Sequence, residues 1–211
     1  MYHLLAFMVL LSCMRCDMPQ DRGSYADPQV LLITELGDIV LEIYVRDAPV
    51  TARNFLRYVD ENRFREARFY RTVTVDNQPD NDIKIEVIQG GIGFIESELR
   101  LPMIVHETTN RTGIRHRDGV ISMARAEVGT ADSEFFICIG DQSELDHGGK
   151  RNPDGQGYAA FGRVIAGMET VRLIHQEPAD AQMLIVPVRI LYCTRVNIQT
   201  GSSFKQTRVK R

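Results

Sequence analysis

The chain has 211 residues and a formal net charge of −3, with 44% hydrophobic and 25% charged residues. This length suits one domain with short flanking segments, and the composition is that of a globular protein that can bury a core. The nearly balanced charge provides no basic surface of the kind that nucleic-acid binding requires, so no nucleic-acid partner is predicted.

The first residues are typical of an export signal. Leu4–Leu11 is an almost unbroken apolar run that is too short to span a bilayer. The four residues that end at Cys13 resemble a bacterial lipobox, in which the cysteine becomes the lipidated first residue of the mature protein. We therefore expect residues 1–13 to direct export, with Cys13 as the candidate lipidation site. A buried N-terminal strand or helix is the alternative.

Three further regions follow along the chain. Residues 14–28 are rich in Asp, Pro, Gln, Gly and Ser without periodicity, which predicts a flexible tether. Residues 29–198 contain neither an internal repeat nor a further linker and are predicted to form one domain. Residues 199–211 form a short tail with a basic end, for which a solvated surface segment is the simplest interpretation.

Within the domain most segments have the pattern of short β-strands. Val30–Thr34 and Asp38–Tyr44 flank a short turn and predict a hairpin. Further strands are predicted at Ala67–Val73, Ile83–Gln89, Gly119–Ala124, Glu134–Ile139, Ala160–Val164 and Val188–Val196. Short strands divided by Gly and Pro loops indicate a barrel or a sandwich, and the pattern alone leaves both open.

Two segments predict helices. Pro49–Tyr58 carries apolar residues at helical spacing, with Asp47 placed to cap its first turn, where proline is tolerated. A shorter helix is predicted at Met168–Ile174, between a glycine and a proline.

The four cysteines do not suggest a metal site. Cys13 and Cys16 are close together, but no second pair has zinc spacing, so no metal or cofactor is predicted. Cys138 and Cys193 lie in apolar strand patterns, where free cysteine usually packs as a small hydrophobe. A disulfide between them remains open in an exported protein.

Six short strings occur in a fixed order along the domain. They are Phe69-Tyr70-Arg71, Val87-Ile88-Gln89-Gly90-Gly91, Ser122-Met123-Ala124-Arg125, Phe135-Phe136-Ile137, Leu145-Asp146 and Phe161-Gly162-Arg163-Val164. Together they resemble the cyclophilin-type peptidyl-prolyl cis/trans isomerases, over about residues 30–196. The resemblance implies a mainly β fold: a closed eight-stranded antiparallel barrel capped by two α-helices. It therefore favours the barrel over the sandwich.

The resemblance also implies the site. Arg71 occupies the position of the family's catalytic arginine, and Gln89 that of the glutamine that binds the substrate backbone. The other substrate-binding positions are Tyr70, Val87, Ala124, Arg125, Glu134, Phe136, Leu145 and Tyr158. A guanidinium suits this chemistry because it stays charged and can donate a hydrogen bond to the amide nitrogen that regains its lone pair when the prolyl bond twists.

Three glutamates depart from the family pattern. Glu86 lies where a phenylalanine usually walls the proline pocket, Glu134 replaces a glutamine, and Glu144 replaces an aromatic residue. We expect these carboxylates to surround Arg71 and to compete with substrate for it, which would either reduce the activity or favour substrates with Lys or Arg near the proline. Residues 74–82 lengthen a connection that is short in most members, and they form either a rim beside the peptide groove or a plain surface loop.

The leading hypothesis is an exported isomerase that assists the folding of periplasmic or cell-surface proteins. Its partners would be proline-containing polypeptides, and it would act as a monomer that meets the membrane only through a lipid anchor. The alternatives are a weakly active or inactive proline-peptide-binding module and a scaffold with the same groove.

Overall fold

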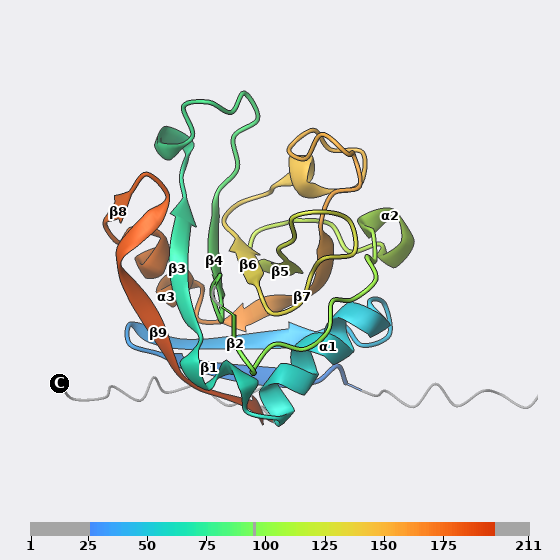
Figure 1. The fold of residues 1–211 in the computed structure, drawn as a ribbon, viewed down its shortest axis with the longest axis vertical. Coiled ribbons are helices and arrows are strands. Elements are labelled where there is room, and N and C mark those ends of the chain that lie inside the picture. Colours follow the sequence, from blue (N-terminus) through green and yellow to red (C-terminus); the bar gives the residue numbers. More distant parts are fainter. Residues whose placement is uncertain (1–25, 95, 197–211) are drawn as a thin grey trace, which may run out of the picture.

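The computed structural model describes residues 26–94 and 96–196 (Figure 1). The predictions for the export segment 1–13, for lipidation of Cys13, for most of the tether 14–28 and for the tail 199–211 fall outside these described residues. Within the described ranges, no helix is long and apolar enough to cross a membrane.

Eight antiparallel strands close into a barrel, which confirms the predicted fold. Their order around the barrel is β1-β2-β7-β5-β6-β4-β3-β9, and β9 closes it by pairing with β1. A short ninth strand, β8, pairs with β9 alone. The bounds are β1 Gln29–Thr34, β2 Gly37–Ile43, β3 Arg68–Val73, β4 Val87–Gly91, β5 Val120–Met123, β6 Phe135–Cys138, β7 Ala159–Ala166, β8 Ala179–Asp180 and β9 Met183–Val196.

Strand β4 begins later than the sequence predicts, at Val87 instead of Ile83. The reason is the buried side chain of Gln78, which takes both backbone groups of Ile85. Its Nε2 donates to the Ile85 carbonyl oxygen at 2.8 Å, and its Oε1 accepts the Ile85 N–H at 3.3 Å. The backbone of Ile85 is thus paired with a side chain of the preceding loop instead of with a strand.

Two of the helices are those predicted, α1 at Pro49–Asp60 and α3 at Met168–His175, and a single turn, α2 at Thr109–Thr112, was not foreseen. The prediction that Asp47 caps α1 is wrong, because Ala48 occupies the N-cap position. The carboxylate of Glu107 caps the helix instead. It accepts the N–H groups of Val50 at 3.2 Å and Thr51 at 2.7 Å.

The barrel interior is filled by aliphatic side chains and a cluster of aromatic rings around Phe55 of α1. The ring centroid of Phe55 lies 5.3 Å from Phe64, 5.5 Å from Phe135 and 5.2 Å from Phe161. Aromatic contacts at this spacing add stabilisation beyond the burial of their area. Helix α1 packs against β7 and β9, while α3 packs against β2, β3 and β4.

A second, smaller apolar cluster lies apart from this interior. Because successive strand residues point to opposite faces, Phe135 belongs to the interior and Phe136 to the second cluster. Cys138 is also in the second cluster, whereas Cys193 is in the interior. Both are buried free thiols, so the disulfide that the sequence left open is not formed. The second cluster forms the floor of the site described next.

Candidate active site

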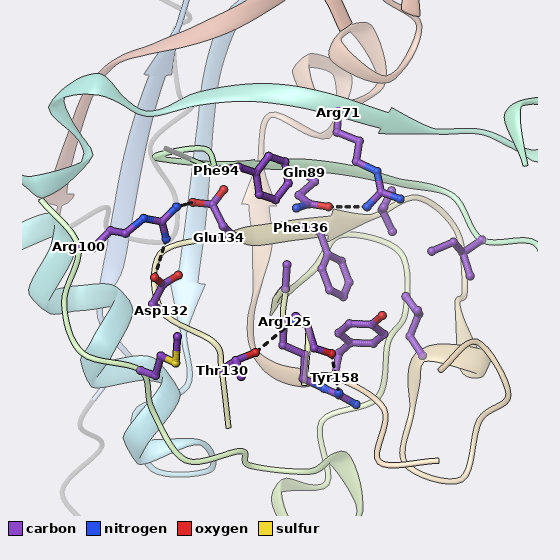
Figure 2. Close-up of a pocket in the computed structure, with 16 residues that line it drawn as sticks. Arg71, Gln89, Phe94, Arg100, Arg125, Thr130, Asp132, Glu134, Phe136 and Tyr158 are labelled. Carbon is purple, nitrogen blue, oxygen red and sulfur yellow. Dashed lines mark hydrogen bonds and ion pairs between the residues drawn. The ribbon is translucent and has the colours of Figure 1, made fainter. Parts of the chain in front are cut away.

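A pocket of about 480 Å³ opens over the second apolar cluster (Figure 2). Arg71 and every predicted substrate-binding residue except Tyr70 line it, and Tyr70 is buried and hydrogen-bonded to the lining residues Gln89 and Glu134. The remaining lining residues were not among the predicted site residues, and they are Ile85, Phe94, Arg100, Met103, Ala126, Thr130 and Asp132. In the described part of the chain, no group of three or more His, Cys, Asp or Glu side chains could hold a metal ion.

The apolar part of the pocket is built around the Phe136 ring. Tyr158 meets this ring edge-on at 5.4 Å, and the buried ring of His116 stacks behind it at 5.9 Å. His116 is itself fixed from both sides. Its Nδ1 lies 2.8 Å from Oδ1 of Asp146, and its Nε2 lies 3.0 Å from Oγ of Ser122. A rigid aromatic wall of this kind suits a small, compact apolar ring such as that of proline.

Ile85 completes this wall, and the expectation that Glu86 would occupy the wall position is wrong. Ile85 is buried and lines the pocket with Val87, whereas Glu86 is not among the lining residues. Gln89 and Val87 are two residues apart and both face the pocket. The same alternation, continued back by two more residues, would have predicted Ile85 on this face of the chain.

Arg71 lies on β3 opposite Gln89 of β4, and its guanidinium is held by two glutamine oxygens. Nη1 donates to Oε1 of Gln89 at 2.7 Å, and Nε donates to Oε1 of Gln182 at 3.0 Å, where Nη2 also donates. Figure 2 shows the Arg71 and Gln89 head groups facing each other above the Phe136 ring. Burial lowers the pKa of Arg71, while the hydroxyls of Tyr70 and Tyr158 act in the opposite direction.

The expected competition of three glutamates for Arg71 does not occur. Within the described part of the chain, Arg71 forms no ion pair with any of the three glutamates, Glu86, Glu134 and Glu144. Glu144 instead accepts the backbone N–H of Lys150 at 2.8 Å. The basis for a preference for Lys or Arg near the substrate proline is therefore lost.

Glu134 is buried and receives four donors. Tyr70 donates its hydroxyl proton to Oε2 at 2.6 Å, while Oε1 accepts from Oγ of Ser133 at 2.8 Å and from the N–H of Gly93 at 3.0 Å. Nη2 of Arg100 lies 3.5 Å from Oε1, and Nη1 of Arg100 forms a closer ion pair with Asp132 at 2.5 Å. Burial raises the pKa of Glu134, although these hydrogen bonds act to lower it.

The side chain of Arg125 has a structural role. Its Nε and Nη2 donate to the carbonyl oxygen of Gly157 at 3.0 and 2.7 Å, and Nη1 pairs with Asp154 at 2.8 Å. Its guanidinium carbon lies 5.2 Å from the centre of the Tyr158 ring. Arg125 thus fixes the loop that presents Tyr158, and the predicted strand edge at Ala124 and Arg125 lines the pocket beside it.

The connection 74–82 is not a pocket rim, and most of its residues are exposed, as the surface-loop alternative predicts. None of its residues lines the pocket. Its buried Gln78 anchors it to the chain before β4, and its Asn77 supplies a carbonyl oxygen that accepts from Nε2 of Gln182 at 3.1 Å. Because Gln182 holds the Arg71 guanidinium, this connection supports the arginine from behind.

Comparison with known proteins agrees with this geometry. Residues 29–195 match the family model described as cyclophilin type peptidyl-prolyl cis-trans isomerase/CLD. The chain belongs to this family. Its function is accordingly that of a peptidyl-prolyl cis-trans isomerase.

Curated relatives of the chain are named as peptidyl-prolyl cis-trans isomerases. The chain is 36% identical over 151 residues to peptidyl-prolyl cis-trans isomerase A of Dickeya dadantii, a match that covers 70% of each chain. It is also 36% identical over 149 residues to the isomerase cyp18 of Streptomyces antibioticus, which covers 69% of this cyclophilin chain and 81% of the relative.

Solved structures show the same fold. A cyclophilin type peptidyl-prolyl cis-trans isomerase of Cryptosporidium parvum superposes with a TM-score of 0.62 at 21% identity, covering 82% of this chain and 99% of that one. A second structure of that protein, determined in the presence of the dipeptide Ala-Pro, gives a TM-score of 0.64 at 23% identity, with 81% and 99% coverage.

Proposed function

We propose that this cyclophilin domain accelerates X–Pro isomerisation by stabilising the twisted amide with Arg71. Amide resonance gives the rotation a barrier of about 18–20 kcal/mol, and no bond to a nucleophile or metal is needed to lower it. When the bond twists, the prolyl nitrogen regains its lone pair and becomes a hydrogen-bond acceptor. A guanidinium aimed at that nitrogen binds the twisted state more tightly than the planar one, which is the condition for catalysis.

The observation that carries this proposal is the joint position of Arg71 and Phe136 in one pocket. The Phe136 wall would hold the proline ring while the guanidinium faces the bond before it. A guanidinium has five N–H donors. Three bonds to Gln89 and Gln182 leave donors for the peptide, within the part of the chain that the structure describes.

The substrates in this proposal are proline-containing polypeptides. A family relative has been crystallised in the presence of Ala-Pro, which is the minimal substrate unit that such a pocket would take. We further propose that the chain acts on exported proteins, on the basis of the apolar run Leu4–Leu11 and of Cys13, and that it meets the membrane only through a lipid on that cysteine. A Cys13→Ser variant that still partitions with membranes would refute the lipid anchor.

An isomerase assay on the full chain tests the catalytic proposal. We expect wild type to accelerate cis/trans exchange of an Ala-Ala-Pro-Phe peptide, measured by NMR exchange spectroscopy, and Arg71→Ala to lose this acceleration. Peptide binding without any acceleration by wild type would instead support a non-catalytic binding module or scaffold.

A further inference from the structure

A continuous hydrogen-bond relay runs from Arg71 to Glu134. Arg71 donates to Oε1 of Gln89 at 2.7 Å, Nε2 of Gln89 donates to the Tyr70 hydroxyl at 2.8 Å, and that hydroxyl donates to Glu134 at 2.6 Å. Gln89, Tyr70 and Glu134 are all buried, so water does not substitute freely for any of these bonds.

The direction of the relay follows from its two ends. An arginine can only donate hydrogen bonds, and a carboxylate can only accept them. The single hydroxyl proton of Tyr70 is committed to Glu134, so its oxygen can only accept from Gln89. Gln89 must therefore turn its NH₂ group to Tyr70 and its oxygen to Arg71.

We propose that Glu134 is a positioning residue for catalysis, which acts through Tyr70 to fix the orientation of the Gln89 amide and thereby aims the Arg71 guanidinium at the bound peptide. This proposal rests on the proposed isomerase function and on the role given there to Arg71. The relay requires the ionised form of Glu134, because only a carboxylate accepts the Tyr70 hydroxyl proton without donating one in return.

The surroundings of Glu134 are built for a carboxylate. From β3 it faces the Tyr70 hydroxyl, from its own segment the Ser133 hydroxyl, and from the loop after β4 the N–H of Gly93 and the guanidinium of Arg100, whose charge is shared with Asp132. Gly91 makes room for it, because a Cβ at that position would lie 2.5 Å from Oε2 of Glu134.

A proton on Glu134 would reverse the relay. The protonated carboxyl could donate to the Tyr70 oxygen, Tyr70 would then donate to Oε1 of Gln89, and the Gln89 NH₂ group would face Arg71, donor against donor. Burial raises the pKa of Tyr70 far above its ordinary value of 10, and the negative charge of Glu134 raises it further. Tyr70 itself therefore keeps its proton. Burial also raises the pKa of Glu134 above its ordinary 4.5, which brings its titration closer to neutral pH.

The test compares Glu134→Gln with wild type between pH 5 and 8, using NMR exchange on an Ala-Ala-Pro-Phe peptide. A glutamine resembles the protonated carboxyl in shape and in its ability to donate. We expect kcat/KM of wild type to fall as the pH drops toward 5, and that of Glu134→Gln to be about five- to tenfold lower at pH 8 and flat across the range, as the loss of one hydrogen bond predicts. Glu144→Gln is the matched control, because Glu144 lies outside the pocket, and it should keep the wild-type profile.

Two further readouts separate positioning from structural damage. Tyr70→Phe breaks the relay at another point, so the double variant should lose no more activity than either single one. The side-chain NH₂ signals of Gln89 in ¹⁵N-edited spectra should shift as Glu134 titrates in wild type and stay fixed in Glu134→Gln, whether or not the chain is an active isomerase. A Glu134→Gln enzyme with wild-type rate and pH profile, beside an inactive Arg71→Ala enzyme, would overturn the relay and leave the proposed function intact. Gln89 signals that do not respond to pH would also overturn it.

Discussion

Replacement of Gln182 by leucine removes the second anchor of the Arg71 guanidinium with little change in side-chain size. Oε1 of Gln182 accepts from Nε at 3.0 Å and also from Nη2, while its own Nε2 holds the carbonyl oxygen of Asn77 at 3.1 Å. In Gln182→Leu the guanidinium would keep only the bond to Gln89. We expect it to occupy several orientations, of which only some face the prolyl nitrogen.

The size of this effect follows from the anchor that is lost. A hydrogen bond to a charged group contributes about 1.5–3 kcal/mol, and water can partly replace it here because Arg71 and Gln182 are only half-buried. The lower end of the range applies, which corresponds to about a tenfold loss because about 1.4 kcal/mol is one factor of ten. The loss should fall on kcat more than on peptide affinity, since the Phe136 wall is untouched.

The assay is kcat and KM for exchange of an Ala-Ala-Pro-Phe peptide, with Gln176→Leu as the matched control. Gln176 lies in the same connection between α3 and β9, but its side chain is exposed, so the same chemical change should leave the rate unaltered. A Gln182→Leu enzyme within about twofold of wild type would refute the argument that this glutamine orients Arg71.

Three other predictions concern the cap of α1, the acid stability and the pocket wall. Glu107→Gln keeps the shape of the cap but removes its charge from the start of α1, where it holds the N–H and hydroxyl of Thr51, and should lower the free energy of unfolding in urea by about 1 kcal/mol. Burial alone would raise the pKa of Asp146, but its bonds from His116 outweigh this and hold the pKa below its ordinary value. The stabilising contribution of Asp146 is therefore full above its ordinary pKa and is lost as the pH falls through its folded pKa, so Asp146→Asn should show a weaker loss of stability between pH 4 and 2 in thermal melts; an unchanged acid limb would contradict this. Phe136→Ala opens the proline wall and should raise KM about tenfold, because truncation of a buried aromatic anchor usually costs more than about 1 kcal/mol of binding, and an unchanged KM would show that the proline ring binds elsewhere.

The parts of the site that could be predicted are those set by short local strings. Arg71 and Gln89 face each other because they lie on paired strands, and Phe136 faces the pocket because it alternates with Phe135, which faces the barrel interior. Each of these placements depends on the pairing of neighbouring strands or on the side of the sheet that a strand residue faces. The six ordered strings therefore identified the fold and seven of the sixteen residues that line the pocket.

The parts that could not be predicted depend on partners far away in the chain. Gln182 reaches Arg71 across 111 residues, and Glu107 caps a helix that begins more than 50 residues earlier. No local pattern marks either residue for its task. The role of Glu134 was misjudged for the same reason, because its place next to the Phe135-Phe136-Ile137 string did not reveal that Tyr70, Ser133 and the distant Arg100 would satisfy its charge.

The central claim is that Arg71 acts on the twisted amide and not on peptide binding. The most direct measurement is the exchange rate of a saturating Ala-Ala-Pro-Phe peptide on wild type and on Arg71→Ala, with the dissociation constant measured in the same NMR titrations. Removal of a donor aimed at a transition state costs about 10²–10³ in kcat, so we predict a loss of that size with a dissociation constant changed less than about threefold. An Arg71→Ala chain that binds the peptide tenfold more weakly, yet exchanges bound peptide at the wild-type rate, would contradict the account.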